Sequence, residues 1–149
     1  SAIVNFKNCR NQLGYLSNKK IKRDTKWVID TFDVKTPSQT VPMRLLSGGN
    51  QQKVIIGKWM LMDLNIILMD EPTRGIDVGA KYEIYQLIID FAKKGKGVIF
   101  VSSEMPELLN ISDRILVLSN GCIADIYDLR EERENVTPEN IFKSAAKYL

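Results

Sequence analysis

The sequence predicts an α/β fold, and two observations carry this prediction. Two short apolar runs, at 66–69 and 97–101, have the length and continuity of strands that are buried on both faces of a parallel sheet. Between them, apolar residues recur at the three- and four-residue spacing of one helix. A strand, a helix and a second strand in this order are typical of an α/β core.

The part of the chain before these strands predicts two helices. One face of a short first helix would carry Ile21, Trp27, Val28 and Phe32. Pro37 follows this helix and would break it. Ser47 then has the position of an N-cap for a second helix that begins near Asn50.

The helix between the two strands would bury Ala80, Ile84, Leu87, Ile88 and Phe91. Gly95 is placed to close this helix, because glycine readily adopts the left-handed conformation found after helix ends. After the second strand, Ser103 or Glu104 would open a short helix with Pro106 near its first turn.

The end of the chain predicts a hairpin followed by a helix. Asn120-Gly121 lies between the apolar segments 114–119 and 122–127, and this dipeptide is the strongest short hairpin signal. Thr137 then has the position of an N-cap, with Pro138 in the first helical position, for a terminal helix through Leu149.

Composition excludes several classes of function. A chain of 149 residues has room for one modest domain, and a net charge of +3 is too small to predict a nucleic-acid partner. The sequence contains no histidine, so neither a histidine base nor a Ser-His-Asp arrangement is available. No apolar run reaches membrane-spanning length. Cys9 and Cys122 are isolated and are expected to be reduced thiols.

The first chemical motif is Leu-Ser-Gly-Gly-Asn-Gln-Gln-Lys at 46–53. It places a hydroxyl, two glycines and an amide directly before a helix. Glycines let a phosphate approach the backbone, and the N-terminus of a helix offers free N–H groups and a positive dipole end. The alternative is an ordinary capped helix start, because Ser-Gly-Gly is common in loops.

The second motif is the apolar run at 66–69, which ends in Asp70-Glu71. Two carboxylates there could hold a nucleotide-bound metal and an attacking water. The alternative is a pair of ordinary acids at the end of a strand. The chain contains no G-x-x-x-x-G-K-[ST] phosphate loop.

In this order and at this spacing, the motifs resemble the signature and Walker B motifs of ATP-binding cassette (ABC) ATPases, and Gly75-Ile76-Asp77 resembles the D-loop. The resemblance implies a partial ABC-type P-loop NTPase domain without the Walker A half. Residues 1–62 would form the helical subdomain with the signature motif. Residues 63–149 would form the C-terminal part of the ATPase core, with Walker B, the D-loop, the switch region, the hairpin and the terminal helix.

The variant Asn50-Gln51-Gln52 and the loop Arg74-Gly75-Ile76-Asp77 are similar to those of sugar importers. The chain most resembles the second cassette of tandem-cassette ATPases of the galactose/methyl-galactoside type. The resemblance implies that the full-length protein is an ATPase that uses ATP and Mg²⁺ to drive import of a monosaccharide. It also implies that the isolated fragment is inactive.

The resemblance also implies roles for individual residues. The signature residues that would contact the γ-phosphate held by the partner cassette are Ser47, Gly48, Gly49 and Gln51. Glu71 would be catalytic and hold the attacking water, Asp70 would lie near Mg²⁺ through water, and Asp77 would belong to the dimer-facing D-loop. Ser103 stands at the switch position, where most cassettes have a histidine. Its alternative role is a helix N-cap.

The partners implied are the first cassette of the same protein or a second copy, membrane permease subunits and, indirectly, a periplasmic or extracellular sugar-binding protein. The protein would lie on the cytoplasmic face of a bacterial cell membrane as a peripheral subunit. Two alternatives remain. One is a degenerate cassette that only completes the ATP site of its partner, and the other is a soluble ABC protein without a role in transport.

Overall fold

The computed structural model describes residues 15–148. The expectation for Cys9 concerns a residue outside this range. Two compact units make up the chain, and the division falls between Ile99 and Phe100. The boundary expected between residues 62 and 63 divides the chain by motif instead, and it stays a prediction.

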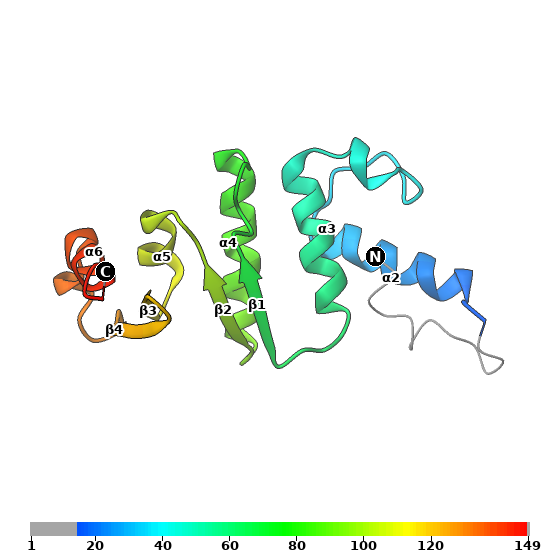
Figure 1. Ribbon diagram of the computed structural model, residues 1–149. Helices are drawn as coiled ribbons and strands as arrows, with labels where there is room; N and C mark the ends of the chain where they lie inside the picture. The colour runs from blue at the N-terminus through cyan, green and yellow to red at the C-terminus, as the bar shows by residue number, and fades with distance from the viewer. Residues whose placement is uncertain (1–14, 149) are drawn as a thin grey trace. The chain divides into compact units, whose positions relative to one another are not determined.

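Among the described residues, the first unit contains helix α2 (Asn18–Thr31), a short 3-10 turn η1 (Met43–Leu45) and helix α3 (Gly48–Met60) (Figure 1). Strand β1 (Ile66–Asp70), helix α4 (Val78–Lys93) and strand β2 (Gly97–Val101) follow. Strands β1 and β2 pair with each other and run in the same direction (Figure 1). The helices and strands expected in this part of the chain are therefore present.

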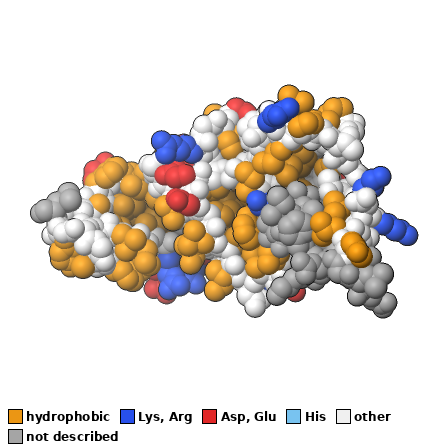
Figure 2. Space-filling model, turned by 45° about the vertical axis from the view of Figure 1, so that its right-hand side comes forward, with side chains coloured by type: hydrophobic (Ala, Val, Ile, Leu, Met, Phe, Trp, Pro, Cys, Tyr) orange, Lys and Arg blue, Asp and Glu red, His pale blue; other side chains and the backbone are white. Residues whose placement is uncertain are grey.

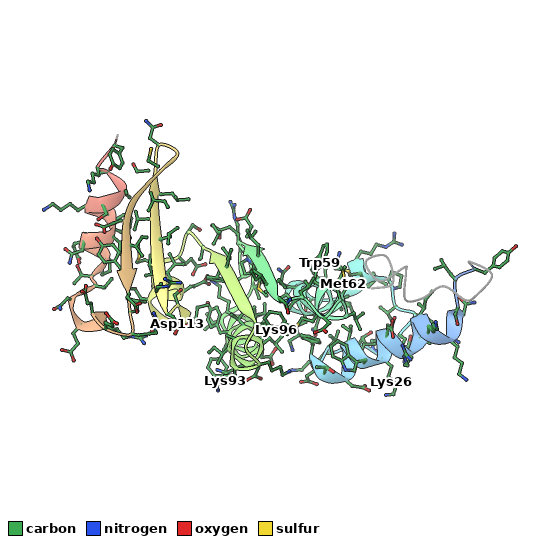
Figure 3. The ribbon with its side chains drawn as sticks, turned by 90° about the horizontal axis from the view of Figure 1, so that it is seen from below. Lys26, Trp59, Met62, Lys93, Lys96 and Asp113 are labelled. Carbon is green, nitrogen blue, oxygen red and sulfur yellow. The ribbon has the colours of Figure 1, made fainter. Side chains whose placement is uncertain are left out.

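Helices α2 and α3 pack closely because Gly57 has no side chain. A Cβ atom at Gly57 would lie 2.6 Å from Val28 Cγ1 and 3.1 Å from the ring of Phe32. Val28 and Phe32 are buried, as expected for the apolar face of the first helix, whereas Trp27 is 42% exposed. Trp59 and Met62, near the end of α3, are also exposed (Figure 3).

The two apolar strands are only partly covered in this chain. In β1, Ile67 and Met69 are buried, whereas Ile66 and Leu68 are 63% and 65% exposed. Strand β2 alternates between half-buried and exposed residues. The physical reason is that a strand-helix-strand unit brings one helix to the sheet, and one helix covers one face. Exposed hydrophobic side chains occur on both units (Figure 2).

The second unit contains helix α5 (Met105–Ile111), strands β3 (Arg114–Ser119) and β4 (Cys122–Asp128), the 3-10 turn η2 (Arg133–Asn135) and helix α6 (Pro138–Ala145). Strands β3 and β4 form the expected antiparallel hairpin. Asn120 and Gly121 have φ values of 48° and 79°, as a two-residue primed turn requires. The core of this unit consists of Ile115, Val117, Ala124, Leu129, Val136 and Ile141.

Helix α6 starts as expected, because the Thr137 side chain accepts a hydrogen bond from the Asn140 N–H. It ends at Ala145 rather than continuing to the end of the chain. The Ser119 hydroxyl donates a hydrogen bond of 2.6 Å to the Ala145 carbonyl, which satisfies one of the unpaired carbonyls at the end of the helix. Cys122 is exposed and forms no disulfide bond within the described residues. No helix within residues 15–148 is long and apolar enough to cross a membrane.

Candidate functional site

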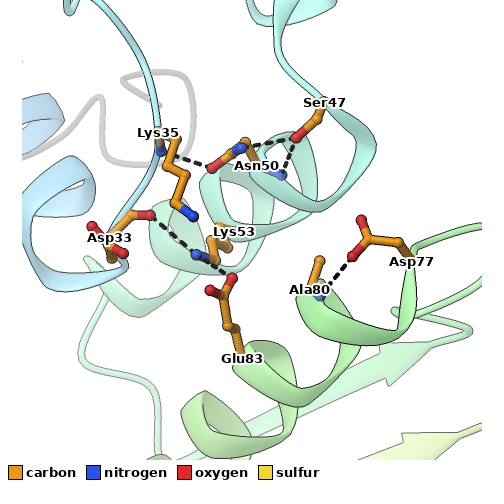
Figure 4. Close-up of polar contacts among 8 residues, drawn as sticks. All are labelled: Asp33, Lys35, Ser47, Asn50, Lys53, Asp77, Ala80 and Glu83. Atoms are coloured by element: carbon orange, nitrogen blue, oxygen red, sulfur yellow. Dashed lines mark hydrogen bonds and ion pairs between the residues drawn. The ribbon is translucent and has the colours of Figure 1, made fainter.

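The signature motif forms the start of α3, and Ser47 is its N-cap as the sequence predicts. Ser47 Oγ accepts a hydrogen bond from the Asn50 N–H at 3.5 Å. The side-chain amide of Asn50 also donates to Ser47 Oγ, at 2.8 Å (Figure 4). Ser47 is exposed, so its hydroxyl faces a space that a ligand can reach.

The two glycines of the motif have different surroundings. A Cβ atom at Gly48 would have no heavy atom within 4 Å, so the backbone there faces open space. A Cβ atom at Gly49 would lie 2.5 Å from Ala80 Cβ. Gly48 is therefore accessible to an approaching phosphate. On the side where a Cβ would lie, the absence of a side chain at Gly49 lets the starts of α3 and α4 come together.

The amide side chains of Asn50 and Gln51 point to different partners. Gln51 Nε2 donates to the Leu46 carbonyl at 2.8 Å. Asn50 instead lines a pocket of about 260 Å³ together with Ser47 and Gly49. Gln51 was predicted as a site residue and Asn50 was not, although an amide three residues after an N-cap serine is a recognisable signal.

Lys53 was also missed as a residue of this site. It is only 3% exposed, and its ammonium group lies 2.7 Å from Glu83 Oε2 (Figure 4). It also donates a hydrogen bond of 3.0 Å to the Asp33 carbonyl. A buried ammonium needs such partners, because desolvation of an unpaired charge is costly. Lys53 thus connects α3 with α4 and with the loop after α2.

The predicted D-loop residue Asp77 is the N-cap of α4, and its side chain accepts a hydrogen bond of 3.0 Å from the Ala80 N–H. Asp77 and Ala80 line the same pocket as Ser47. The structure therefore brings Ser47, Gly49 and Asp77 together. The remaining lining residues are Lys35, Asn50, Lys53, Gly79 and Glu83.

Asp70 and Glu71 lie at the end of β1 and are not lining residues of this pocket. Asp70 is the last residue of the strand and is exposed. Glu71 has a φ of 46°, a left-handed conformation that is unfavourable for a side chain of this kind. Its carbonyl accepts a hydrogen bond from the Arg74 N–H, so the chain turns sharply just after the strand. Residues 15–148 contain no cluster of three metal-ligating side chains.

Ser103 lies in the second unit, where the N-cap of α5 is Glu104. The alternative role of Ser103 as the N-cap is therefore wrong, and the expectation that named Glu104 is confirmed. Ser102, which was not among the predicted residues, is central to this turn. Its hydroxyl donates to Glu107 Oε2 at 2.7 Å and accepts from the Glu104 N–H at 3.0 Å. The first of these bonds gives the buried carboxylate of Glu107 a hydrogen-bond partner.

Comparisons with known proteins identify the class. The ABC transporter family matches residues 2–74. The galactose/methyl galactoside import ATP-binding protein MglA of Pasteurella multocida is 58% identical over all 149 residues, and the MglA of Escherichia coli K12 is 58% identical over 135 residues. The chain spans 29% of the length of the first relative and 27% of the second.

Solved structures agree on the fold. A metal-chelate type ABC transporter in an inward-facing conformation matches 91% of this chain and 52% of its own, with 21% identity and a TM-score of 0.73. A dimeric bacterial ABC transporter cassette matches 78% of this chain and 50% of its own, with 25% identity and a TM-score of 0.67. The chain belongs to the ABC transporter family. The expected family and fold class are thereby confirmed.

Proposed function

We propose that this chain is part of the ATP-hydrolysing subunit of an importer of galactose or methyl galactosides. The names of the relatives that are 58% identical over the chain support this substrate class. Because the chain spans less than a third of those relatives, the proposal concerns the complete subunit. Within it, this segment would contribute the signature motif, the Walker B carboxylates and the D-loop.

The observation that carries the proposal is the geometry at the start of α3. Gly48 faces open space, the Ser47 hydroxyl is exposed beside it, and the first N–H groups of a 13-residue helix are near. Such an arrangement favours an anionic oxygen, because both the N–H groups and the helix dipole attract negative charge. Ser47, Gly48 and Gly49 would contact the γ-phosphate of ATP that the partner cassette holds.

Gln51 is a weaker contributor to phosphate binding than the other signature residues. Its amide already donates to the Leu46 carbonyl, so a phosphate contact would require this bond to break. Gln51 remains part of the signature motif, and its role would be to support the loop before Ser47.

The described residues fit Mg²⁺ only in a limited way. Asp70 is an exposed carboxylate, and residues 15–148 contain no group of three His, Cys, Asp or Glu side chains that could hold a metal ion. It would therefore hold Mg²⁺ through water, while the nucleotide supplies the direct ligands. Glu71, placed by the turn after β1, would orient the attacking water or accept its proton. Ser103 would occupy the switch position, where a hydroxyl can contact a phosphate but cannot supply the charge of a histidine.

The proposed partners follow from this assignment. A solved cassette with 25% identity is a dimer, and a related structure is described as bound to ADP and Pi. The signature motif of this chain would face a first cassette of the same protein or a second copy, with Asp77 at the dimer interface. Permease subunits would anchor the complete protein at the cytoplasmic face of the membrane, and a sugar-binding protein would deliver the substrate to them. No nucleic-acid partner is proposed.

The test is a pair of serine substitutions in the complete transporter ATPase. Ser47 and Ser17 are both helix N-caps whose side chains accept a backbone hydrogen bond. Each change to alanine should cost about 1 kcal/mol of stability. Ser47→Ala should also lower ATP turnover by about tenfold or more, the loss expected for one hydrogen bond to a charged group. Ser17→Ala should leave turnover near wild type, and equal turnover in both variants would refute the assignment.

A degenerate cassette is the second candidate, and the serine at position 103 favours it. In that case Glu71→Gln should lower turnover much less than Ser47→Arg, because only the partner's site would hydrolyse ATP. If Glu71→Gln abolishes turnover while Ser47→Arg stays active, the two sites have been assigned the wrong way round. Sugar uptake in cells that carry the complete system separates both candidates from an ABC protein without a role in transport.

A further inference from the structure

A chain of two hydrogen bonds runs from the loop after α2 to the hydroxyl of the signature serine. The backbone N–H of Lys35 donates to Asn50 Oδ1 at 2.8 Å. The amide nitrogen of Asn50 donates in turn to Ser47 Oγ, also at 2.8 Å (Figure 4). These hydrogen bonds join segments that are distant in the sequence, because Lys35 and Asn50 are 15 positions apart.

The chemistry of the Lys35 N–H fixes the orientation of the Asn50 amide. A backbone N–H can only donate, so it requires the amide oxygen of Asn50 on its side. The NH₂ group of Asn50 must then face Ser47. Because an NH₂ group can only donate, Ser47 Oγ has to act as the acceptor.

Ser47 Oγ therefore accepts two hydrogen bonds from the protein. It accepts from the Asn50 side chain and, at 3.5 Å, from the Asn50 backbone N–H. A serine hydroxyl has two acceptor positions and one proton. With both acceptor positions used, the proton is directed away from Asn50. Within residues 15–148, Ser47 Oγ donates to no protein acceptor.

We propose that Asn50 is a positioning residue that fixes the proton of the Ser47 hydroxyl toward an anionic ligand oxygen, such as a phosphate of ATP. This inference rests on the proposed function, because it assumes that Ser47 contacts the phosphate. The hydroxyl is then a donor before the ligand arrives, and no rotation of the proton is needed on binding. Such preorganised donors are more effective than donors that must reorient.

A capping role alone does not account for this geometry. Ser47 caps α3 by accepting a hydrogen bond from the backbone N–H of Asn50, and the Asn50 side chain takes no part in that bond. The bonds that the Asn50 side chain makes are to Lys35 and to the cap itself. Asn50 therefore acts through Ser47 rather than on the helix directly.

The first experiment needs no nucleotide. Hydrogen exchange of the Lys35 amide is measured in the complete subunit for wild type, Asn50→Ala and Asn50→Asp. Asn50→Ala removes the acceptor, so exchange at Lys35 should become about tenfold faster or more, as for the loss of a hydrogen bond. Asn50→Asp keeps an acceptor of the same shape and should preserve the protection. Unchanged exchange at Lys35 in Asn50→Ala would overturn the inference.

The second experiment is a double-mutant cycle in ATP turnover. Asn50→Ala and Ser47→Ala should each reduce turnover, and the double variant should be no slower than Ser47→Ala alone, because Asn50 acts through Ser47. Losses that multiply would mean that Asn50 acts independently, and a silent Asn50→Ala would also overturn the inference. If Ser47→Ala itself leaves turnover unchanged, the proposed function fails instead, so the two failures are distinguishable.

Asn50→Asp adds a pH readout that a purely structural residue would not give. An ionised carboxylate introduced by this change can only accept, so the Ser47 proton should turn toward it and leave the phosphate without its donor. The protonated form of the same carboxyl can accept from Lys35 and donate to Ser47, which restores the original arrangement. Relative to wild type, turnover of Asn50→Asp should rise as the pH falls, and the Ser47→Ala background should lose most of this rise. A flat ratio between variant and wild type would contradict the inference.

Discussion

Lys53 Nζ lies 2.7 Å from Glu83 Oε2, which pairs a buried ammonium on the signature helix with a carboxylate on the helix that Asp77 caps. The same ammonium donates to the Asp33 carbonyl. One side chain thus connects the α2–α3 region to the D-loop helix. The Lys53–Glu83 ion pair is therefore positioned to keep the signature motif and the D-loop together when the signature motif moves.

The first prediction concerns this pair. Lys53→Met should lower the free energy of unfolding by about 1–3 kcal/mol, because Glu83 and the Asp33 carbonyl lose a buried partner. The expected loss of stability stays within this range because Glu83 is 43% exposed, so solvent already screens part of the interaction. Denaturant unfolding of the chain measures the effect.

The matched control for Lys53 is Lys96, which pairs with Asp63 at 2.9 Å. The side chains of this pair are 23% and 94% exposed, and exposed pairs contribute about 0–1 kcal/mol. Lys96→Met should therefore be nearly neutral. Equal losses for the two lysine variants would show that Lys53 has no special role.

The second prediction separates the two glycines of the signature motif. Gly49→Ala should destabilise the chain by about 1–3 kcal/mol, because its methyl group would overlap Ala80. Gly48→Ala should change stability little, since its methyl group would face open space. Thermal unfolding provides the comparison. Ala80→Gly should partly rescue Gly49→Ala, and no rescue would mean that the overlap is not the cause.

The third prediction is a dependence of stability on pH at the end of the hairpin. A side-chain hydrogen bond from Arg130 lowers the pKa of Asp128 from 3.8 to about 2. Because the folded pKa is depressed, the stabilising contribution is present above pH 3.8 and is lost as the pH falls toward 2. Arg130→Gln should therefore be less stable than wild type at neutral pH, and this difference should shrink across that window.

Asp128→Asn is the control for the acid titration. In that background, Arg130→Gln should cause no further change in the pH dependence, because the titrating partner is absent. A stability difference between wild type and Arg130→Gln that persists unchanged to pH 2 would contradict the assignment.

The fourth prediction is that the chain self-associates in solution. Ile66, Leu68 and Ile99 are exposed on the strands β1 and β2, and exposed apolar strands favour pairing with other chains. Leu68→Lys should reduce the association that light scattering detects. Leu45, which is 70% exposed outside any strand, supplies the control Leu45→Lys. A monomeric wild type at high concentration would refute this prediction.

The fifth prediction is that the isolated chain neither hydrolyses ATP nor binds it tightly. Its sequence has no phosphate loop to supply the N–H groups and the lysine that hold the β- and γ-phosphates. Calorimetric titration with Mg-ATP is the measurement. Low-micromolar binding by a monomer, about −8 kcal/mol, would show that the signature segment binds nucleotide without a partner.

The sequence by itself determined the order of the elements and the family. Apolar periodicity, the caps at Ser47 and Thr137 and the Asn120-Gly121 turn are local signals, and each acts over a few neighbouring residues. For this reason α6 and the hairpin start where the sequence predicts, and α3 has its predicted N-cap at Ser47 although it starts at Gly48, two residues before the expected position. The Leu46–Lys53 and Asp70–Asp77 motifs were equally readable, because their chemistry is contiguous in the chain.

Only the tertiary structure decided which residues act together. Lys53 meets Glu83 and Asp33, Asn50 meets Lys35, and Gly49 meets Ala80, and each contact joins segments whose separation in the sequence carries no local signal. The Ala145 carbonyl at the end of α6 likewise accepts a hydrogen bond from Ser119, which lies 26 positions earlier. Local patterns set the conformation of a segment, whereas packing between segments decides which polar groups become partners and which glycine must remain a glycine.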